Sequence, residues 1–289
     1  MAQYVGVAGF VQVDSLREAS GLARSGRRGD VLWVVNDSGN RPELYAIATN
    51  GTHLGTWTVT NAVNEDWEDL ALWESSDGPL LVVADVGDNV GVRSQVTIHL
   101  IPEPEVAHTG GLARVQMTLH IRYEDGPRDC EAVAVSSSTS ELLLLSKRDR
   151  PPRLYVVPLV SPRDGPNVTN LVARRCATLS VGPWTQCPDS SWSPLHALEV
   201  MPTAMDNDPT GRRLVILTYS DAWVVEFPRD GHWATLNHAT WSRCALPSRD
   251  AKGPEALRGR EAIAWSRDGR TVYVTGERRH PPIWILHVD

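Results

Sequence analysis

Short apolar runs alternate with polar turns along the whole chain. The runs are of strand length and rich in Val, Ile, Leu, Trp and Tyr, as in residues 31–35, 96–101 and 271–275. This length and composition indicate β-strands. No segment of about 12 residues or more keeps a 3.6-residue apolar period, which argues against a helical or a βαβ protein. The pattern therefore predicts an all-β fold.

A four-residue motif recurs and indicates a repeated unit. A small or polar residue is followed by two small or aliphatic residues and then mostly by Ala, and each copy precedes further strands. The motif starts at Ser20, Glu68, Glu131, His196 and Glu261. Repetition at this spacing is typical of radially arranged four-stranded sheets, so we expect a β-propeller.

Counting the strands predicts five blades in one domain spanning residues 1–289. The innermost strands are expected at 19–24, 67–72, 130–135, 195–201 and 260–265. The last blade lacks an outer strand, and the N-terminal segment 4–13 can supply it and leave no open sheet edge. The alternative of six blades would divide residues 160–260 into two units, although only one full strand set is found there.

Composition narrows the classes of function. The 289 residues carry a net charge of −7, so the basic footprint of a nucleic-acid-binding protein is missing. No apolar run approaches the 18 or so residues that span a membrane, and the start does not resemble a signal peptide. We therefore expect a cytoplasmic protein or a mature exported domain. The four cysteines have no CxxC spacing, a Cys176–Cys187 disulfide stays open, and so does the oligomeric state.

The repeated motif also predicts the central chemistry. Innermost strands of a propeller lie side by side around a channel, so the first residues of the motif face one another. These residues are Ser20, Glu68, Glu131, His196 and Glu261. Like charges in a narrow channel repel unless some are protonated or a cation binds. Oxygen ligands favour Ca²⁺, whereas His196 is a poor ligand for it. The alternative is that each glutamate pairs with a neighbouring blade or with water.

Polar residues gather in the loops expected at one end of this channel, the channel mouth. The loops after the second strands contribute Asp37, Asp85, Asp88, Lys147, Arg148, Tyr219, Glu277 and Arg278, and the loops entering the innermost strands add Asp66, Trp67 and Trp192. Taken singly, such residues are ordinary turn formers. Together they predict a binding face.

Several longer phrases carry a family resemblance. DWEDLAL, LLVVADVGDN, DGPRDCEAVAV and GREAIAWSRDGRTVYVT resemble a mainly bacterial, uncharacterised group of β-propellers related to the SdiA-regulated and esterase-like propellers. The order Ser20, Glu68, Glu131, His196, Glu261 also resembles the central Ca²⁺ ligands of calcium-activated apyrases, which are five-bladed propellers with Ser, Glu, Glu, Ser and Glu in chain order. This second resemblance implies a central Ca²⁺ site, and the fourth residue departs from it.

Three functions remain open at this point. The first is a Ca²⁺-dependent hydrolase of a nucleotide or other phosphorylated small molecule. In it Asp37, Asp85 or Asp88 orients the water, while Lys147, Arg148 and Arg278 neutralise phosphate charge. Tyr219, Glu277, Trp67 and Trp192 would complete the ligand site. The second is a glycoside hydrolase with paired carboxylates. The third is a non-catalytic propeller that binds a ligand or protein and holds a structural metal.

Overall fold

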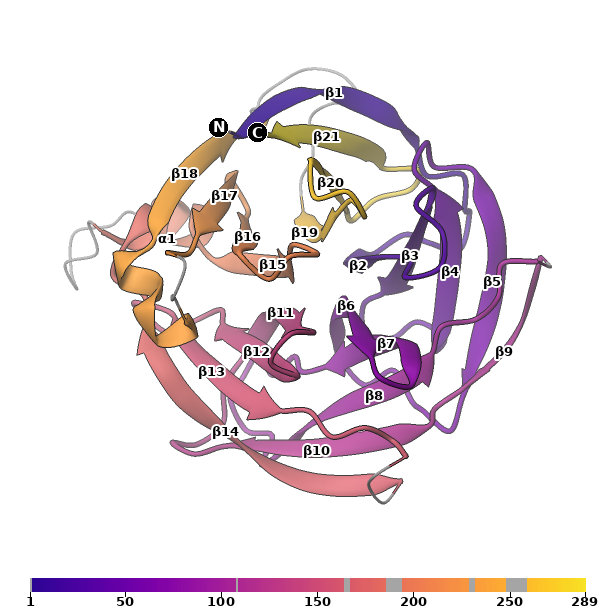
Figure 1. Cartoon of the computed structure of the whole chain (residues 1–289), viewed down its shortest axis with the longest axis horizontal. Coiled ribbons are helices and arrows are strands. Elements are labelled where there is room, and N and C mark those ends of the chain that lie inside the picture. The colour runs from indigo at the N-terminus through magenta and orange to yellow at the C-terminus, as the bar shows by residue number, and fades with distance from the viewer. Residues whose placement is uncertain (1, 108, 164–166, 186–193, 229–231, 248–258) are drawn as a thin grey trace.

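The strands form sheets that radiate from a central axis (Figure 1). The computed structural model describes residues 2–107, 109–163, 167–185, 194–228, 232–247 and 259–289, with residues 194–196 described by their backbone alone. The two chain ends lie side by side at the rim of the ring. No helix of this described part is long and apolar enough to cross a membrane.

Each sheet has an innermost strand followed outward by its antiparallel neighbours. The first set is β2 (Ala19–Arg24), β3 (Val31–Asn36), β4 (Glu43–Ala48) and β5 (His53–Thr60). The second is β6 (Trp67–Ser75), β7 (Gly78–Asp85), β8 (Val96–Pro102) and β10 (Met117–Tyr123). The third is β11 (Cys130–Ser136), β12 (Glu141–Ser146), β13 (Arg153–Pro158) and β14 (Val168–Thr178). The fourth is β15 (Pro202–Asn207), β16 (Arg213–Thr218), β17 (Asp221–Glu226) and β18 (Thr240–Ala245), and the last holds β19 (Arg260–Trp265), β20 (Thr271–Gly276) and β21 (Pro282–Val288).

The innermost strands close a ring, which makes the fold a β-propeller. β2 lies beside β6, β6 beside β11, β11 beside β15, β15 beside β19, and β19 again beside β2. The approach of β2 to β6 is close, because a Cβ atom on Gly21 would lie 2.5 Å from the backbone nitrogen of Leu70. The apolar core lies between successive sheets around this ring.

The N-terminal strand completes the last sheet, as the sequence predicts. β1 (Ala2–Phe10) pairs antiparallel with β21, from Ala2 opposite Val288 to Phe10 opposite Pro282. The ring is therefore closed by both ends of the chain, and the outer edge of β21 is covered.

Deleting residues 1–10 should lower the melting temperature by about 10 °C or more, because it removes a strand and exposes a sheet edge. Thermal unfolding followed by circular dichroism measures this, and adding the deleted peptide in trans should restore part of the loss. The matched control is Val5→Ser, which changes an exposed side chain of β1 and keeps the strand. An unchanged melting curve for the truncated chain would contradict the closure.

Two features of the outer strands were not predicted. β9 (Gly110–Arg114) leaves the second set and pairs in parallel with β5. β14 pairs in parallel with β10, from Val168 opposite Thr118 to Ala173 opposite Tyr123, and this joins the second and third sets into one eight-stranded sheet. Both pairings cover outer strand edges that would otherwise stay open.

The predicted innermost strand at 195–201 is wrong. Residues Pro194–Glu199 form the helix α1, and the innermost strand of this set is β15. The sequence PLHALE begins with proline and continues with good helix formers, which favours a helix start over a strand. His196 therefore lies outside the innermost strands, and its side chain lies outside the described part of the chain.

Two buried aspartates link the innermost strands across the channel. Asp69 of β6 accepts hydrogen bonds from the backbone nitrogens of Val133 in β11, at 2.8 Å, and Met205 in β15, at 3.4 Å. Asp206 of β15 accepts one from Trp265 in β19 at 2.8 Å and lies 3.8 Å from the Arg24 guanidinium of β2.

Burial raises the pKa of both carboxyls, to about 6 for Asp206. Together the two side chains reach all of the innermost strands.

Asp69→Leu should lower the free energy of unfolding by about 2–5 kcal/mol, because it leaves the buried N–H groups of Leu70, Val133 and Met205 without their acceptor. Asp69→Asn keeps a carbonyl oxygen in place and should lose clearly less. Guanidinium unfolding of the two variants makes the comparison, and equal stability of the leucine and asparagine variants would contradict the bridging role.

Candidate functional site

Every innermost strand carries a β-bulge at the same position near its start. The residue skipped in the pairing is Ser20, Glu68, Glu131, Thr203 or Glu261, in chain order. The bulge breaks the alternation of side chains at equivalent points of the five strands. The register therefore places Thr203, not His196, in this column.

The two hydroxyls of the column each donate to a backbone carbonyl oxygen, and the two acceptors occupy equivalent positions of neighbouring strands. The Ser20 hydroxyl donates to the carbonyl oxygen of Trp67 at 2.8 Å, and the Thr203 hydroxyl donates to that of Arg260 at 2.7 Å. Each acceptor directly precedes a column glutamate. These hydroxyls therefore tie neighbouring strands together just beside the carboxylates, and their oxygens keep acceptor capacity.

One lysine contacts one glutamate of the column directly and a second one through a tyrosine hydroxyl. The Lys147 ammonium contacts Glu131 and lies 3.1 Å from the Tyr219 hydroxyl, which donates to Glu261 at 2.8 Å. All four side chains come from different strands or loops around the mouth, and Lys147 is only 8% exposed.

The charges of this network shift its pKa values. Burial alone would lower the pKa of Lys147, but Glu131 and then Glu261 and Glu68 raise it above its ordinary value, so it stays an ammonium. Burial raises the pKa of Glu131 despite Lys147, and burial with Glu277 raises that of Glu261. One positive charge thus lies among more carboxyls than it can neutralise.

The third glutamate does not join this hydrogen-bond network. Glu68 is 6% exposed and has no hydrogen-bond or ion-pair partner among the residues that the structure describes. One carboxylate oxygen each of Glu68, Asp37 and Asp66 lie within 4.8 Å of one another. Burial raises the pKa of all three carboxyls; repulsion by Asp37 raises it further for Asp66 and Glu68, and repulsion by Glu277 does so for Asp37.

Gly87 forms one wall of this corner. A Cβ atom there would lie 2.3 Å from an oxygen of Asp66 and 2.4 Å from one of Glu68. The absence of a side chain at residue 87 is therefore what lets the two carboxylates come together. The sequence drew attention to the loop around Gly87 but gave no signal for this contact.

Two of the predicted catalytic acids hold loops in place. Asp85 accepts backbone hydrogen bonds from Glu65 and Asp66 and pairs with Arg93 at 2.9 Å. Asp88 accepts from the backbone nitrogens of Val92 and Arg93 at 2.9 and 2.8 Å. Both carboxylates are buried, and these bonds use the oxygens that would orient a water. Of the three predicted catalytic acids, Asp37 is the one whose carboxylate lies near those of Asp66 and Glu68, and its pKa is raised.

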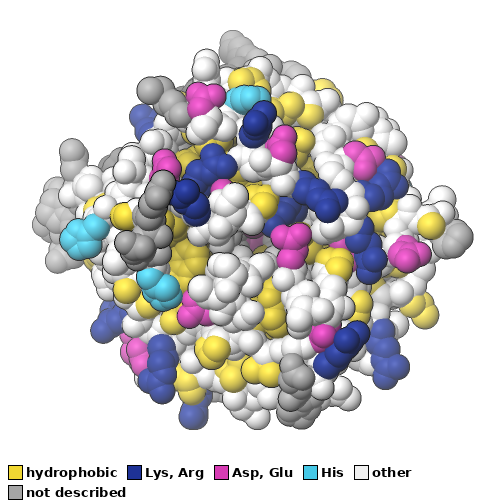
Figure 2. Space-filling view, in the orientation of Figure 1, with side chains coloured by type: hydrophobic (Ala, Val, Ile, Leu, Met, Phe, Trp, Pro, Cys, Tyr) yellow, Lys and Arg dark blue, Asp and Glu magenta, His cyan; other side chains and the backbone are white. Residues whose placement is uncertain are grey.

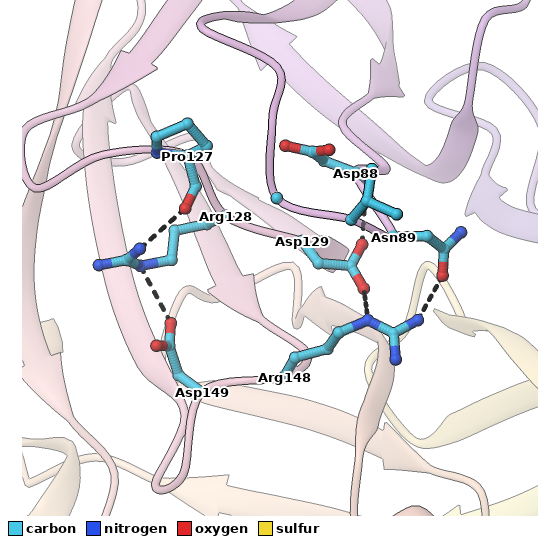
Figure 3. A pocket seen from close by; sticks show the side chains of 9 residues that line it. Asp88, Asn89, Pro127, Arg128, Asp129, Arg148 and Asp149 are labelled. Atoms are coloured by element: carbon cyan, nitrogen blue, oxygen red, sulfur yellow. Dashed lines mark hydrogen bonds and ion pairs between the residues drawn. The ribbon is translucent and has the colours of Figure 1, made fainter.

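A pocket of about 250 Å³ lies beside the mouth, between the loops that follow β7 and β12 (Figure 3). Arg148 lies between Asp129 and Asn89 and contacts both, while Arg128 reaches Asp149 at 3.2 Å. The Arg148 side chain is 46% exposed and that of Arg278 is exposed as well, so a ligand can reach these two predicted cations more easily than the buried Lys147.

Of the remaining predicted site residues, one is buried in the core, two lie at the mouth and one lies outside the described part of the chain. Trp67 is fully buried in the core and donates its ring N–H to the carbonyl of Val63, so it offers no face to a ligand. The backbones of Glu277 and Glu18 pair in an isolated antiparallel β-bridge at the mouth, and the Arg278 backbone nitrogen donates to the carbonyl oxygen of Arg17. Trp192 and Cys187 lie outside the described residues.

Charges of both signs mix on the surface. Figure 2 shows one face of the ring, on which Lys and Arg side chains lie among Asp and Glu side chains around its middle. The mouth loops share this mixed character, because Lys147, Arg93 and Arg148 each contact a carboxylate.

Comparison with known proteins adds little to this geometry. No family model and no curated protein matches the chain. Similar solved structures include the PQQ domain of pyranose dehydrogenase from Coprinopsis cinerea, with 13% identity over 99% of this chain and 97% of that one and a TM-score of 0.47.

Others are the PQQ-bound aldose sugar dehydrogenase from Streptomyces coelicolor, with 10% identity over 100% and 98% and a TM-score of 0.49, and hydrazine synthase from Kuenenia stuttgartiensis, with 10% over 93% and 83% and a TM-score of 0.45. TM-scores below 0.5 are too low to support an argument about activity. The resemblances to the SdiA-regulated and esterase-like propellers and to the apyrases stay predictions.

Lys147→Met should destabilise chelator-treated protein more at pH 8 than at pH 5. Since the pKa values of Glu131 and Glu261 are raised on folding, their protonation favours the folded state, and stability falls as pH rises above about 4.3. Losing the ammonium steepens this fall. Melting temperatures across the pH range measure it, and adding Glu131→Gln should recover part of the loss at pH 8. A pH-independent difference would contradict the charge network.

Proposed function

We propose that the channel mouth binds Ca²⁺ together with a phosphate-bearing small molecule and hydrolyses a phosphoanhydride or phosphoester bond in it. The observation that supports this is the imbalance of charge at the mouth. Glu68, Glu131, Glu261, Asp37 and Asp66 gather there, and one buried lysine contacts this set. Such a set is stable in ionised form only when a further cation shares it.

The donors suit calcium. Carboxylate and hydroxyl oxygens on several loops and strands can adopt the six to eight ligands that Ca²⁺ takes, and no cysteine belongs to the column. When bound, the ion supplies positive charge against a phosphoryl oxygen.

The chain's own groups supply the rest of the proposed reaction. Asp37 takes the proton of the attacking water, whose oxygen bonds to phosphorus as the bond to the leaving oxygen breaks. Arg148 neutralises charge on the phosphate, and Tyr219 and Glu277 line the same end. Asp85 holds the backbone of Asp66 and Asp88 that of Arg93, in two further loops of the mouth.

The blade count belongs to the same proposal. We count five blades, one for each bulged innermost strand, and take β1 as the outer strand of the last blade. The described residues between 160 and 260 contain one innermost strand, β15, which favours this count over six.

A non-catalytic role is the second candidate, and one observation favours it. The mouth carboxylates come from different strands and loops, so a bound ion would tie them together even without a reaction. Glycoside hydrolysis, which needs two carboxyls about 5–9.5 Å apart, is the third.

The first candidate is tested by phosphate release from a panel of nucleotides and sugar phosphates, with Ca²⁺ and with chelator. Asp37→Asn should lower the rate by about 10²-fold or more, because it removes the proposed base. Arg148→Ala and Lys147→Ala should each weaken turnover, and chelator should abolish it.

The matched control is Arg174→Ala, which removes a 76% exposed arginine from the outer strand β14 and should leave the rate unchanged. Release that is indifferent to chelator, or equal losses in all four variants, would contradict the proposal. Release of aryl alcohol from aryl glycosides on the same protein would instead favour the glycosidase.

A further inference from the structure

The column glutamates differ in how their charge is balanced. Glu131 has the Lys147 ammonium, and Glu261 is linked to the same ammonium through the Tyr219 hydroxyl. This half of the mouth already contains a cation built into the chain. A divalent ion placed between Glu131 and Glu261 would lie beside Lys147 and be repelled by it.

The other half contains the opposite situation. Glu68 is buried and has no partner in the described part of the chain, and its carboxylate faces those of Asp37 and Asp66 within 4.8 Å. A buried ionised carboxyl without a partner is costly, and the like charges of the half-buried Asp37 and Asp66 beside Glu68 add to that cost.

We infer that the divalent cation binds off the channel axis, between Asp37, Asp66 and Glu68, while Lys147 serves as the permanent counter-ion of Glu131 and Glu261. The inference builds on the proposed function and gives its cation a specific place. Of the ligands that the sequence predicts, Glu68 would then bind the ion, whereas Ser20, Glu131 and Glu261 would only lie around it.

The loops around this corner suit such a site. Asp37 follows β3 of the first sheet, Asp66 directly precedes β6 of the second, and Glu68 is the second residue of β6. Asn64 donates to the backbone carbonyl of Asp37 at 2.8 Å, and Asp85 accepts from the backbone nitrogen of Asp66 at 3.2 Å. The backbone of both loops is thus fixed, so the carboxylates are held together by the fold itself.

Gly87 offers a test that changes no charge. An alanine there places its Cβ within 2.4 Å of the oxygens of Asp66 and Glu68 and pushes both away. Only the ends of two side chains have to move, so the fold should tolerate the change while the site opens.

The experiment is a calorimetric titration of chelator-stripped protein with CaCl₂. Wild type should bind one ion, and Asp66→Asn and Gly87→Ala should each weaken binding about tenfold or more. Glu65→Gln is the control for net charge, because this neighbouring carboxylate is 68% exposed and pairs with Arg93; it should bind as wild type does. Circular dichroism melts confirm that the variants are folded.

Three results would overturn the inference: no Ca²⁺ binding by wild type, wild-type affinity in folded Asp66→Asn and Gly87→Ala, or a loss confined to Glu131→Gln and Glu261→Gln, which would place the ion on the channel axis. Phosphate release measured on the same preparations separates the two proposals. Loss of Ca²⁺ binding in Asp66→Asn, with wild type releasing no phosphate, would support the site and refute the hydrolase.

Discussion

The structure depends on how its innermost strands are held together without pairing to one another. Each of these strands has one edge in a sheet and the other edge facing the channel, where N–H groups need acceptors. Asp69 and Asp206 supply them from two positions and reach strands of every sheet. Nearer the mouth, the Ser20 and Thr203 hydroxyls do the converse and donate to backbone carbonyl oxygens of the neighbouring innermost strands. Polar side chains must therefore be buried at the centre of the ring, and the central chemistry follows from this need.

The same geometry makes the mouth acidic. A bulge at an equivalent point of every innermost strand brings one side chain per strand into one column, and three of these are glutamates. The fold thus concentrates like charges that repel in the absence of a counter-ion. Lys147 contacts Glu131 on one side, whereas Glu68 on the other has no direct partner among the described residues and keeps a raised pKa. The contrast between the two halves follows from the loop after β12, which inserts an ammonium, and the loop after β7, which has a glycine at residue 87.

The mouth loops separate residues that hold the backbone from residues that can act. Asp85 and Asp88 look like catalytic acids in the sequence, yet their oxygens accept backbone N–H groups of their own and adjoining loops. Trp67 looks like a stacking platform, yet it fills the core. Asp37 and Arg148 remain available, since one faces the acidic corner and the other is half-exposed beside a pocket. Loop residues of the same type thus differ in role according to what their side chains bond.

Most strands, the closed ring and four members of the central column can be predicted from the chain alone, although a helix lies where the strand at 195–201 is expected. Strand length, β-branched composition and the motifs at Ser20, Glu68, Glu131 and Glu261 are local properties, and local pattern suffices to find them. The empty outer position of the last sheet likewise predicted the pairing of the N-terminal strand. Thr203 takes the fourth place for reasons that no local pattern predicts: the motif at His196 forms a helix, and the register of β15 depends on its partner β16. The contact of Lys147 with Glu131 and the gathering of Asp37, Asp66 and Glu68 also depend on tertiary structure, since both join loops far apart in the chain.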